Sequence, residues 1–389
     1  MKRVVSTFAI LLVAAAFSFA GGSSETASPA PTAAQDLLSM PWDQLVAQAK
    51  KEGKVTFYAW YKQNYFDAVA KHFKDTYGID ATVVIGDQTA NMNKAIAEKA
   101  AQVGTIDAMV LGGVMVAPAM SMKLVYGPLQ QRLPDADKIS PASWKTQEGV
   151  AINGYLVPFM RNQTGLLYDP ARVSNPPQTW DQLSAWIDAN PKQFGFNDPQ
   201  KGGAGQAFVQ TLLKYTAGGL DKYYGDTAVD SSKTADWSKA WDWVNQRKDK
   251  ITITNSNNDS AQRVNDGELS LVVEWDDIAV AMMGNGQLSK SFKLYIPQMG
   301  LAGGGDSIGV MANSPHKAAA ILFAATVISQ AEQAALSAPD VGLYPARTDV
   351  AASNTLIDPK DRQYSLPWIP GPYKTLFISE FVKNVLMSQ

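Results

Sequence analysis

Hydrophobic residues between positions 60 and 80 recur with the period of an α-helix. They fall at i, i+3, i+4, i+7 and i+11 in the series Phe66, Val69, Ala70, Phe73 and Tyr77. This spacing predicts a helix with one apolar face, because residues three and four apart lie on the same side. Gly78 follows the series, and a glycine at this place commonly ends a helix.

The neighbouring segments predict strands and further helices in alternation. Runs rich in β-branched and aromatic residues predict strands at 55–60, 79–85 and 106–111. Helices are expected at 42–51 and 90–103, and a glycine follows each of them closely. Strands that alternate with helices of this size predict a parallel, doubly wound sheet.

The later part of the chain predicts a second set of such elements. Thr179 and Gln182 form a capping-box pattern in front of an apolar helix. Strands are expected at 269–274 and 308–311, and Ser314-Pro315 opens a helix that runs to 328. The predicted fold class is therefore α/β with two lobes, each a doubly wound sheet flanked by helices, joined by hinge crossings.

The first residues predict export. Lys2 and Arg3 precede an apolar stretch at 7–17, and small residues follow it up to Ala20. This pattern is typical of a secretory signal peptide that is cleaved near Ala20. Residues 21–36 are polar and small and predict a flexible linker. Because the chain contains no cysteine, we expect no lipid anchor and a periplasmic protein.

Composition excludes several classes of function. The 389 residues include no cysteine and two histidines, which leaves no material for thiolate metal sites or cysteine nucleophiles. Lys and Arg number 34 against 36 Asp and Glu, so the basic excess of a nucleic-acid binder is missing. No later apolar run reaches the length of a membrane-spanning helix. We expect no cofactor, no metal, no nucleic-acid partner and no integral membrane segment.

Aromatic and acidic residues follow two predicted strands. Trp60 and Tyr61 follow the first strand, and Trp275, Asp276 and Asp277 follow the strand that ends at Glu274. Ligands of open α/β sheets bind beyond the carboxyl ends of strands. An aromatic face beside carboxylates suits a cation or a stacked sugar ring. The alternative is that both tryptophans are core residues at strand ends.

Loops before predicted helices supply further candidates for ligand binding. Gly203, Gly205 and Gln206 precede an apolar helix, where bare backbone N–H groups can receive a polar ligand group. A flexible loop explains the glycines equally well. The remaining candidates at strand ends are Gln88, Thr89, Gly112 and Gly113.

Asp306 and Ser307 lie in a segment that formally matches the serine-hydrolase motif G-x-S-x-G. That motif requires a strand before the serine and a helix after it, whereas here glycines precede and a strand-like run follows. We therefore expect a loop in which Asp306 or Ser307 hydrogen-bonds a solute. Arg161 can clamp a carboxylate or phosphate, but an internal ion pair is the slightly preferred interpretation.

The ordered set of segments resembles the extracellular solute-binding proteins of bacterial ABC importers, the family 1-like type II periplasmic binding proteins. This group includes maltose-, polyamine-, thiamine- and iron-binding members. The resemblance is carried by Val55–Trp60, Leu156–Phe159, Gly165–Asp169, Pro177–Leu183 and Ser314–Ala319. It implies that two lobes close on a solute by a hinge motion. It also implies that Tyr344 stands near the region between the lobes.

The resemblance further implies where the chain crosses between lobes: near 157–161, near 291–295 and near 330. Lobe 1 is then expected at 37–157 plus 292–330, and lobe 2 at 158–291 plus 331–389. The implied partners are the membrane permease of an ABC importer and its ATPase, with the protein itself a monomer.

Together these features predict a periplasmic binding protein that delivers a small polar solute, with a cation slightly preferred over a carbohydrate, to an ABC importer. The competing hypothesis is an exported hydrolase, either a glycosidase or a serine hydrolase, that acts in the same cleft. A surface adhesin fits the export signal but not the paired α/β units.

Overall fold

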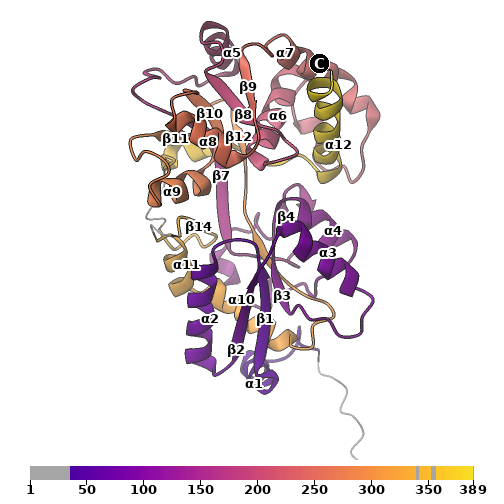
Figure 1. Ribbon diagram of the computed structural model, residues 1–389. Helices are drawn as coiled ribbons and strands as arrows, with labels where there is room; N and C mark the ends of the chain where they lie inside the picture. Colours follow the sequence, from indigo (N-terminus) through magenta and orange to yellow (C-terminus); the bar gives the residue numbers. More distant parts are fainter. Residues whose placement is uncertain (1–35, 339–340, 352–355, 389) are drawn as a thin grey trace, which may run out of the picture. The chain divides into compact units, whose positions relative to one another are not determined.

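The computed structural model describes residues 36–338, 341–351 and 356–388, within which two large mixed sheets carry most of the fold (Figure 1). The predicted signal peptide, and all but the last residue of the predicted linker, lie outside the described residues.

Helices and strands alternate along much of the chain. In chain order, the α-helices are α1 (Trp42–Glu52), α2 (Gln63–Tyr77), α3 (Gln88–Glu98), α4 (Val116–Ser121), α5 (Trp180–Ala189), α6 (Gly203–Thr216), α7 (Ser238–Asn245), α8 (Asn257–Asn265), α9 (Asp276–Gly284), α10 (Lys317–Val327), α11 (Gln330–Leu336) and α12 (Gly371–Phe381). The strands are β1 (Lys54–Ala59), β2 (Asp80–Ile85), β3 (Ala108–Leu111), β4 (Thr146–Gln147), β5 (Val150–Ala151), β6 (Val157–Pro158), β7 (Met160–Tyr168), β8 (Phe194–Asn197), β9 (Ile251–Thr254), β10 (Leu271–Trp275), β11 (Lys293–Tyr295), β12 (Leu301–Gly304), β13 (Ser307–Val310), β14 (Tyr344–Pro345) and β15 (Ser365–Leu366). Short helical turns lie at Gly113–Met115, Ala136–Lys138, Asp221–Tyr223, Ser231–Trp237, Pro359–Tyr364 and Val382–Leu386.

The first sheet has the strand order β2-β1-β3-β13-β6. Strand β1 pairs in parallel with β2 and with β3, as the alternation of strands and helices predicts. Strand β13 comes from much later in the chain and pairs antiparallel with both β3 and β6. The sheet is therefore mixed, because a return strand is added to its parallel part.

The second sheet has the strand order β15-β12-β7-β10-β8-β9. Its nine-residue strand β7 pairs antiparallel with β10, and successive parts of β7 also pair with β11, β12 and β14. Strand β8 lies between β10 and β9 and pairs in parallel with both. Strand β7 is thus the element around which this sheet is assembled.

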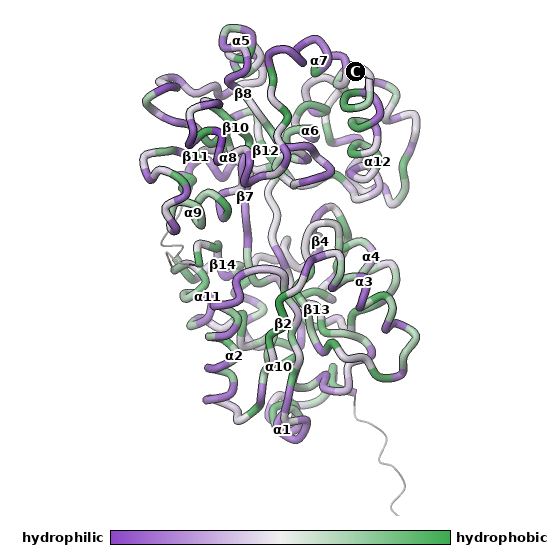
Figure 2. Tube along the Cα trace, in the orientation of Figure 1, coloured by the Kyte–Doolittle hydropathy of each residue, from purple (hydrophilic) through white to green (hydrophobic). Residues whose placement is uncertain are grey.

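Each sheet has its own hydrophobic core. In the first core the ring of Phe57 on β1 lies 4.9 Å from that of Phe66 on α2 and 5.0 Å from that of Phe323 on α10. In the second core Phe196 on β8 and Phe208 on α6 have ring centres 4.4 Å apart. Helix α1 is largely hydrophilic apart from its buried stripe (Figure 2).

The local signals for helix ends are confirmed. Gly53 and Gly78 follow α1 and α2 in the left-handed conformation, with φ of 70° and 73°, which glycine adopts without strain. Thr179 and Gln182 form the full capping box of α5. Helix α3 differs from the predicted range 90–103, because it is capped by Asp87, begins at Gln88 and ends at Glu98.

The chain passes between the two sheets later than the resemblance implies. Strands β11 and β12 still pair with β7, so the return to the first sheet occurs between Gly304 and Ser307 rather than near 291–295. Leu336 at the end of α11, Leu343 and Ala346 pack in the first core, whereas Ile357 packs in a further cluster with Leu167 and Val272 of the second sheet. The last passage therefore follows Ala346 and does not lie near 330.

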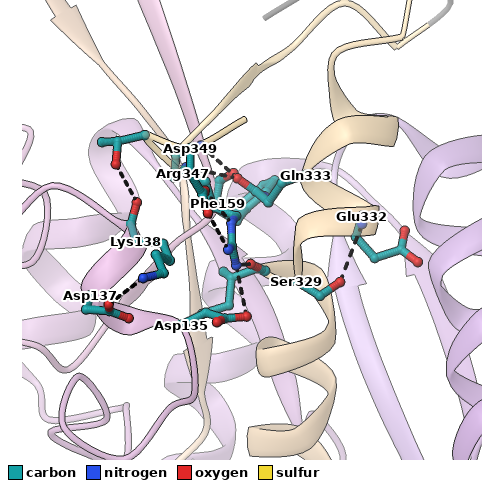
Figure 3. Close-up of polar contacts among 12 residues, drawn as sticks. Asp135, Asp137, Lys138, Phe159, Ser329, Glu332, Gln333, Arg347 and Asp349 are labelled. Carbon is teal, nitrogen blue, oxygen red and sulfur yellow. Dashed lines mark hydrogen bonds and ion pairs between the residues drawn. The ribbon is translucent and has the colours of Figure 1, made fainter. Parts of the chain in front are cut away.

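A buried polar network holds the segment around Arg347 against the first core (Figure 3). The Arg347 guanidinium contacts Asp349 at 2.8 Å and Asp135 at 2.9 Å. The Gln333 side chain donates to the carbonyl of Phe159 at 2.7 Å and accepts from the backbone of Ala346 at 2.8 Å. This network ties the start of β7 to the segment that contains β14.

Among the described residues, no single helix is long and apolar enough to cross a membrane. Helices α10 and α11, bent by 61°, meet the length and composition criteria only as a pair.

Candidate functional site

A cavity of about 550 Å³ is lined by residues that belong to both sheets and their helices, and we call it the larger cavity. The side of the first sheet contributes the loop after β1, the start of α3 and the loop around Glu148. The side of the second sheet contributes the start of α6, the first turn of α9, Trp368 and Lys374. Asn162 on β7 and Asp306 before β13 line it where the chain passes between the sheets.

The structure brings most of the predicted site residues together at this cavity. Those that line it are Trp60, Tyr61, Gln88, Thr89, Gly113, Gly203, Gln206, Trp275, Asp277 and Asp306. Arg161 and Ser307 instead line a second cavity, together with Asp306. Gly112, Gly205, Asp276 and Tyr344 line neither cavity.

Trp60 and Tyr61 follow β1, as predicted, and their ring centres lie 5.2 Å apart. The Tyr61 hydroxyl donates to the Asp306 carboxyl at 2.5 Å. Burial raises the pKa of Asp306 to about 7, and nearby Glu148 and Asp277 act in the same direction, while the Tyr61 hydrogen bond opposes them. Burial, followed by Asp306, also raises the pKa of Tyr61, so the hydroxyl remains a donor.

The backbone of Gly112 lies directly against the Asp306 carboxyl. A Cβ atom at Gly112 would lie 1.8 Å from Asp306 Oδ1, which no real contact allows. Gln88 also donates to the carbonyl of Gly112 at 3.2 Å. Gly112 therefore shapes the site by leaving room for a carboxylate, although it does not line the cavity.

Trp275 ends β10, and its indole lies against the first turn of α6. A Cβ atom at Gly203 would lie 2.7 Å from a ring carbon of Trp275. Trp275 is 8% exposed and packs in the second core, as the alternative interpretation expects, and it also lines the larger cavity, so its contact with a ligand stays a prediction. Gly205 faces away from the cavity, because its N–H donates to Asn197 at 2.6 Å.

The two aspartates at the start of α9 have different surroundings. Asp276 is fully buried and accepts hydrogen bonds from the backbone N–H groups of Gln163 at 2.8 Å and Asp277 at 2.9 Å. Asp277 lines the larger cavity. The pKa of both carboxyls is raised by burial, and the charge of Lys62 partly opposes this rise at Asp277.

Eleven of the residues that line the larger cavity were not predicted from the sequence, and three of these contact one another. Lys374 on α12 forms an ion pair with Glu148, and its ammonium lies 3.7 Å from the ring centre of Trp368. The contact joins an acid near β4 to a helix more than 220 residues later. No local pattern could indicate it, because each residue alone resembles an ordinary loop or helix residue.

Several buried polar atoms at the larger cavity have no hydrogen-bond partner within the described chain. Asn162 Oδ1, Asn257 Oδ1 and Asp277 Oδ1 are acceptors, and Trp368 Nε1 is a donor. Buried polar atoms are normally paired, because an unpaired group costs free energy. Their positions suit a ligand that offers several donors and at least one acceptor.

A second cavity of about 400 Å³, the smaller cavity, adjoins the first. The two share Glu148, Asn162, Asp306 and Trp368. Arg161 and Arg362 also line the smaller cavity. The Arg362 guanidinium lies 4.1 Å from the ring centre of Tyr344, which places Tyr344 behind this cavity.

Ser307 is not a nucleophile elbow. It lies within β13, is 2% exposed and pairs with Leu111 and Pro158. His316 contacts Asp107 at 3.0 Å. Within the described residues, no group of three His, Cys, Asp or Glu side chains could hold a metal ion.

Comparisons with known proteins agree with this architecture. The family model for bacterial extracellular solute-binding proteins matches residues 68–363. A search of curated protein sequences finds no match. The family contains solute-binding proteins rather than enzymes, and the resemblance identified from the sequence is confirmed.

Solved structures of ABC-transporter binding proteins share the two-lobed fold. PotD of Streptococcus pneumoniae, a spermidine/putrescine substrate-binding protein in complex with calcium and HEPES, has a TM-score of 0.66 at 14% identity, over 85% of this chain and 98% of that chain. A solute-binding protein of Thermotoga lettingae bound with α-D-tagatose has a TM-score of 0.65 at 17% identity, over 85% and 93%. AfuA of Actinobacillus pleuropneumoniae, with fructose-6-phosphate bound, has a TM-score of 0.63 at 15% identity, over 86% and 99%.

The two-lobed fold, the cavity lined from both sheets and a family match over most of the sequence lead to one conclusion: the chain belongs to the bacterial extracellular solute-binding proteins.

Proposed function

We propose that this chain captures a small polar solute in the larger cavity and delivers it to the permease of an ABC importer, whose ATPase drives uptake. The signal peptide expected from the sequence places this function in the periplasm, with the protein acting as a monomer. The observation that carries the proposal is the lining of one cavity by residues from both sheets. A solute that contacts both sides favours the closed arrangement of a hinged protein.

The polar lining supports a solute that carries hydroxyl or ammonium groups. Asn162, Asn257 and Asp277 present acceptor oxygens, and Trp60 and Trp275 add aromatic surface. A sugar hydroxyl or an ammonium N–H can satisfy such acceptors, and either group packs well against an indole. This lining suits both solutes considered from the sequence, the slightly preferred cation and the carbohydrate.

The charges around the larger cavity favour a cationic solute less than the sequence implied. Three acids line the larger cavity, but Glu148 is paired with Lys374 and Asp306 accepts from Tyr61. The positive charge of Lys62 acts on the Asp277 carboxyl and lowers its pKa. With each acid partly compensated, we propose a solute whose ammonium group, if present, is one feature among several hydrogen-bonding groups.

Ligand-induced stabilisation tests the proposal. A binder of the folded state raises the melting temperature, so we would screen polyamines, thiamine derivatives, sugars, sugar acids and sugar phosphates by thermal shift and confirm binders by calorimetry. Trp60→Ala should weaken the affinity for the best binder by about 10- to 100-fold, since aromatic contacts at binding sites contribute on the order of 1 to 3 kcal/mol.

Trp186→Ala is the matched control. Trp186 on α5 packs against the second core and does not line the larger cavity, so this variant should lower stability and leave affinity unchanged. Equal affinities of wild type and Trp60→Ala would remove Trp60 from the site. Failure of every screened compound to bind would count against the proposed function itself.

A further inference from the structure

Arg161 is a partly buried cation that lines the smaller cavity and forms no ion pair within the described residues. Its Nε donates to the carbonyl of Pro345 at 3.0 Å, and the described residues offer this side chain no other hydrogen bond. Arginine ion pairs within the described residues are formed by Arg247, Arg263, Arg347 and Arg362, and not by Arg161. The internal ion pair preferred from the sequence is therefore not formed.

The surroundings of Arg161 make its charge costly. Burial lowers the pKa of Arg161 below its ordinary value and the neighbouring charge of Arg362 lowers it further, while Tyr344 and Asp276 act in the opposite direction. Arg362 lines the same cavity, and its Nη2 atom has no hydrogen-bond partner and lies 3.7 Å from Asp276 Oδ2. Two guanidinium groups at one cavity, with the single carboxyl of Asp276 close to both, favour a positive potential there.

The acids around the cavity form no ion pair with Arg161. Asp276, whose charge does act on Arg161, accepts from the backbone N–H groups of Gln163 and Asp277, and burial raises the pKa of its carboxyl. Glu148 is paired with Lys374, and Asp306 accepts from Tyr61. Because the pKa of Asp306 is raised to about 7, its carboxyl is largely uncharged below neutral pH and repels an anion less than an ordinary aspartate. The positive charge of Arg161 is thus available to a ligand.

We infer that the solute carries an anionic oxygen group, a carboxylate or a phosphate, which Arg161 binds in the smaller cavity. The inference rests on the proposed function, because it assigns one group of the solute captured in the adjoining larger cavity. Guanidinium groups bind planar carboxylate and phosphate oxygens through two parallel hydrogen bonds. The Nη atoms of Arg161 remain available for such a pair.

The shared lining of the two cavities indicates how one solute occupies both. Asn162 and Asp306 line both cavities, and Arg161 directly precedes Asn162 on β7. The hydroxyl- or ammonium-bearing part then lies in the larger cavity against the unpaired acceptors, and the anionic group lies beside Arg161. A sugar acid, a sugar phosphate or an amino acid-like zwitterion has this distribution of groups.

The first test measures stability without ligand. In Arg161→Gln we expect a melting temperature equal to or above that of the wild type, because the variant removes a partly buried charge that forms no ion pair within the described residues. Arg347→Gln is the matched comparison, since Arg347 is 3% exposed and contacts two carboxylates. It should melt several degrees lower. A comparable loss in Arg161→Gln would overturn the inference, because it would show that Arg161 is paired internally.

The second test compares matched probes at constant ionic strength. D-Gluconate and glucose 6-phosphate carry the two candidate anionic groups, D-glucose carries neither, and putrescine is the competing cation. We expect one of the anions to bind most tightly, with a loss of roughly 10- to 100-fold in Arg161→Gln. Arg263→Gln, at a residue of α8 that lines neither cavity, should leave the affinity unchanged.

The outcomes separate this inference from the proposed function. Tightest binding of glucose or putrescine, with affinity lost in Trp60→Ala but unchanged in Arg161→Gln, would overturn the anion inference and leave the proposed function standing. Binding of no probe by the wild type would overturn the inference for these anions. If the broader thermal-shift panel also failed, the proposed function would fail with it.

Discussion

At the scale of single residues, burial rather than residue type decides the character of the site. Asp306 and Asp277 are ordinary aspartates in the sequence, but their partial burial at the cavity raises the pKa of both. Arg161 is likewise partly buried and forms no ion pair within the described residues. A solute that supplies complementary groups is favoured because it compensates costs that folding alone has left in place.

Asp306 should make stability depend on pH in a defined direction. Its folded pKa of about 7 lies above the ordinary value of 3.8, so the folded state holds a proton that the unfolded state has released. The free energy of unfolding contributed by Asp306 is therefore fully present below pH 4 and is lost as pH rises to about 7. In Asp306→Asn this loss should disappear, which corresponds to a difference on the order of 2 to 4 kcal/mol between the two pH limits.

Urea unfolding of the ligand-free protein at several values between pH 4 and pH 8 measures this difference. Asp75→Asn serves as the control, because Asp75 is exposed and the pKa of its carboxyl is lowered by Lys71 rather than raised. Parallel stability curves for the wild type and Asp306→Asn would show that the Asp306 carboxyl is not desolvated in the ligand-free protein.

Gly112 offers a steric test of the same carboxylate. In Gly112→Ala the new Cβ must displace Asp306, since the two atoms would be 1.8 Å apart. Its φ of −152° suits any residue, so only the contact is strained. We expect a loss of about 1 to 3 kcal/mol in the free energy of unfolding, measured by urea.

The matched control for Gly112→Ala is Gly371→Ala, where the nearest heavy atom would be 3.4 Å away. That variant should unfold close to the wild-type midpoint. Wild-type stability in Gly112→Ala would mean that Asp306 has room to move and that contact with the Gly112 backbone does not fix its position.

At the scale of elements, the sequence predicts what neighbouring residues decide and misses what distant ones decide. The stripe from Phe66 to Tyr77 predicts α2 well, because helical periodicity is local. The pairing of β13 with β3 and the place of Lys374 beside Glu148 depend on residues far apart in the chain. The positions of Trp60 and Trp275 directly after predicted strands correctly indicated that they line a cavity. Ligand sites of such sheets lie at the carboxyl ends of the strands.

The capping box of α5 allows a test of one element in isolation. The Thr179 hydroxyl accepts a hydrogen bond from the backbone N–H of Gln182, and the Gln182 side chain accepts one from the backbone N–H of Thr179. Thr179→Ala should lower the free energy of unfolding by about 1 kcal/mol, and Thr179→Ser should restore most of it. Solute affinity should not change in either variant, because α5 lines neither cavity. An unchanged free energy of unfolding in Thr179→Ala would show that packing of Trp180 and Leu183 alone stabilises the start of the helix.

At the scale of the whole molecule, the passages between the sheets and the cavity lining belong to the same segments. Asn162 and Asp306 lie where the chain passes between the sheets, and both line the two cavities. Under the proposed function, closure bends the backbone at these passages, and a solute that bonds to these residues acts there. Binding and closure are then coupled, because contacts from both sheets form together only in the closed arrangement.

This coupling can be measured by distance, and the chain is suited to the experiment because it contains no cysteine. Spin labels at Thr89→Cys and Lys201→Cys would report on the larger cavity from opposite sheets, since both residues are exposed and line it. Saturating solute should shorten and narrow the distance distribution between the labels. A second pair at Lys51→Cys and Lys71→Cys, both exposed near the first sheet, should keep its distance. An unchanged distribution for the first pair, under conditions where calorimetry shows full binding, would mean that the solute is held without closure and that the permease must recognise some other feature of the loaded protein.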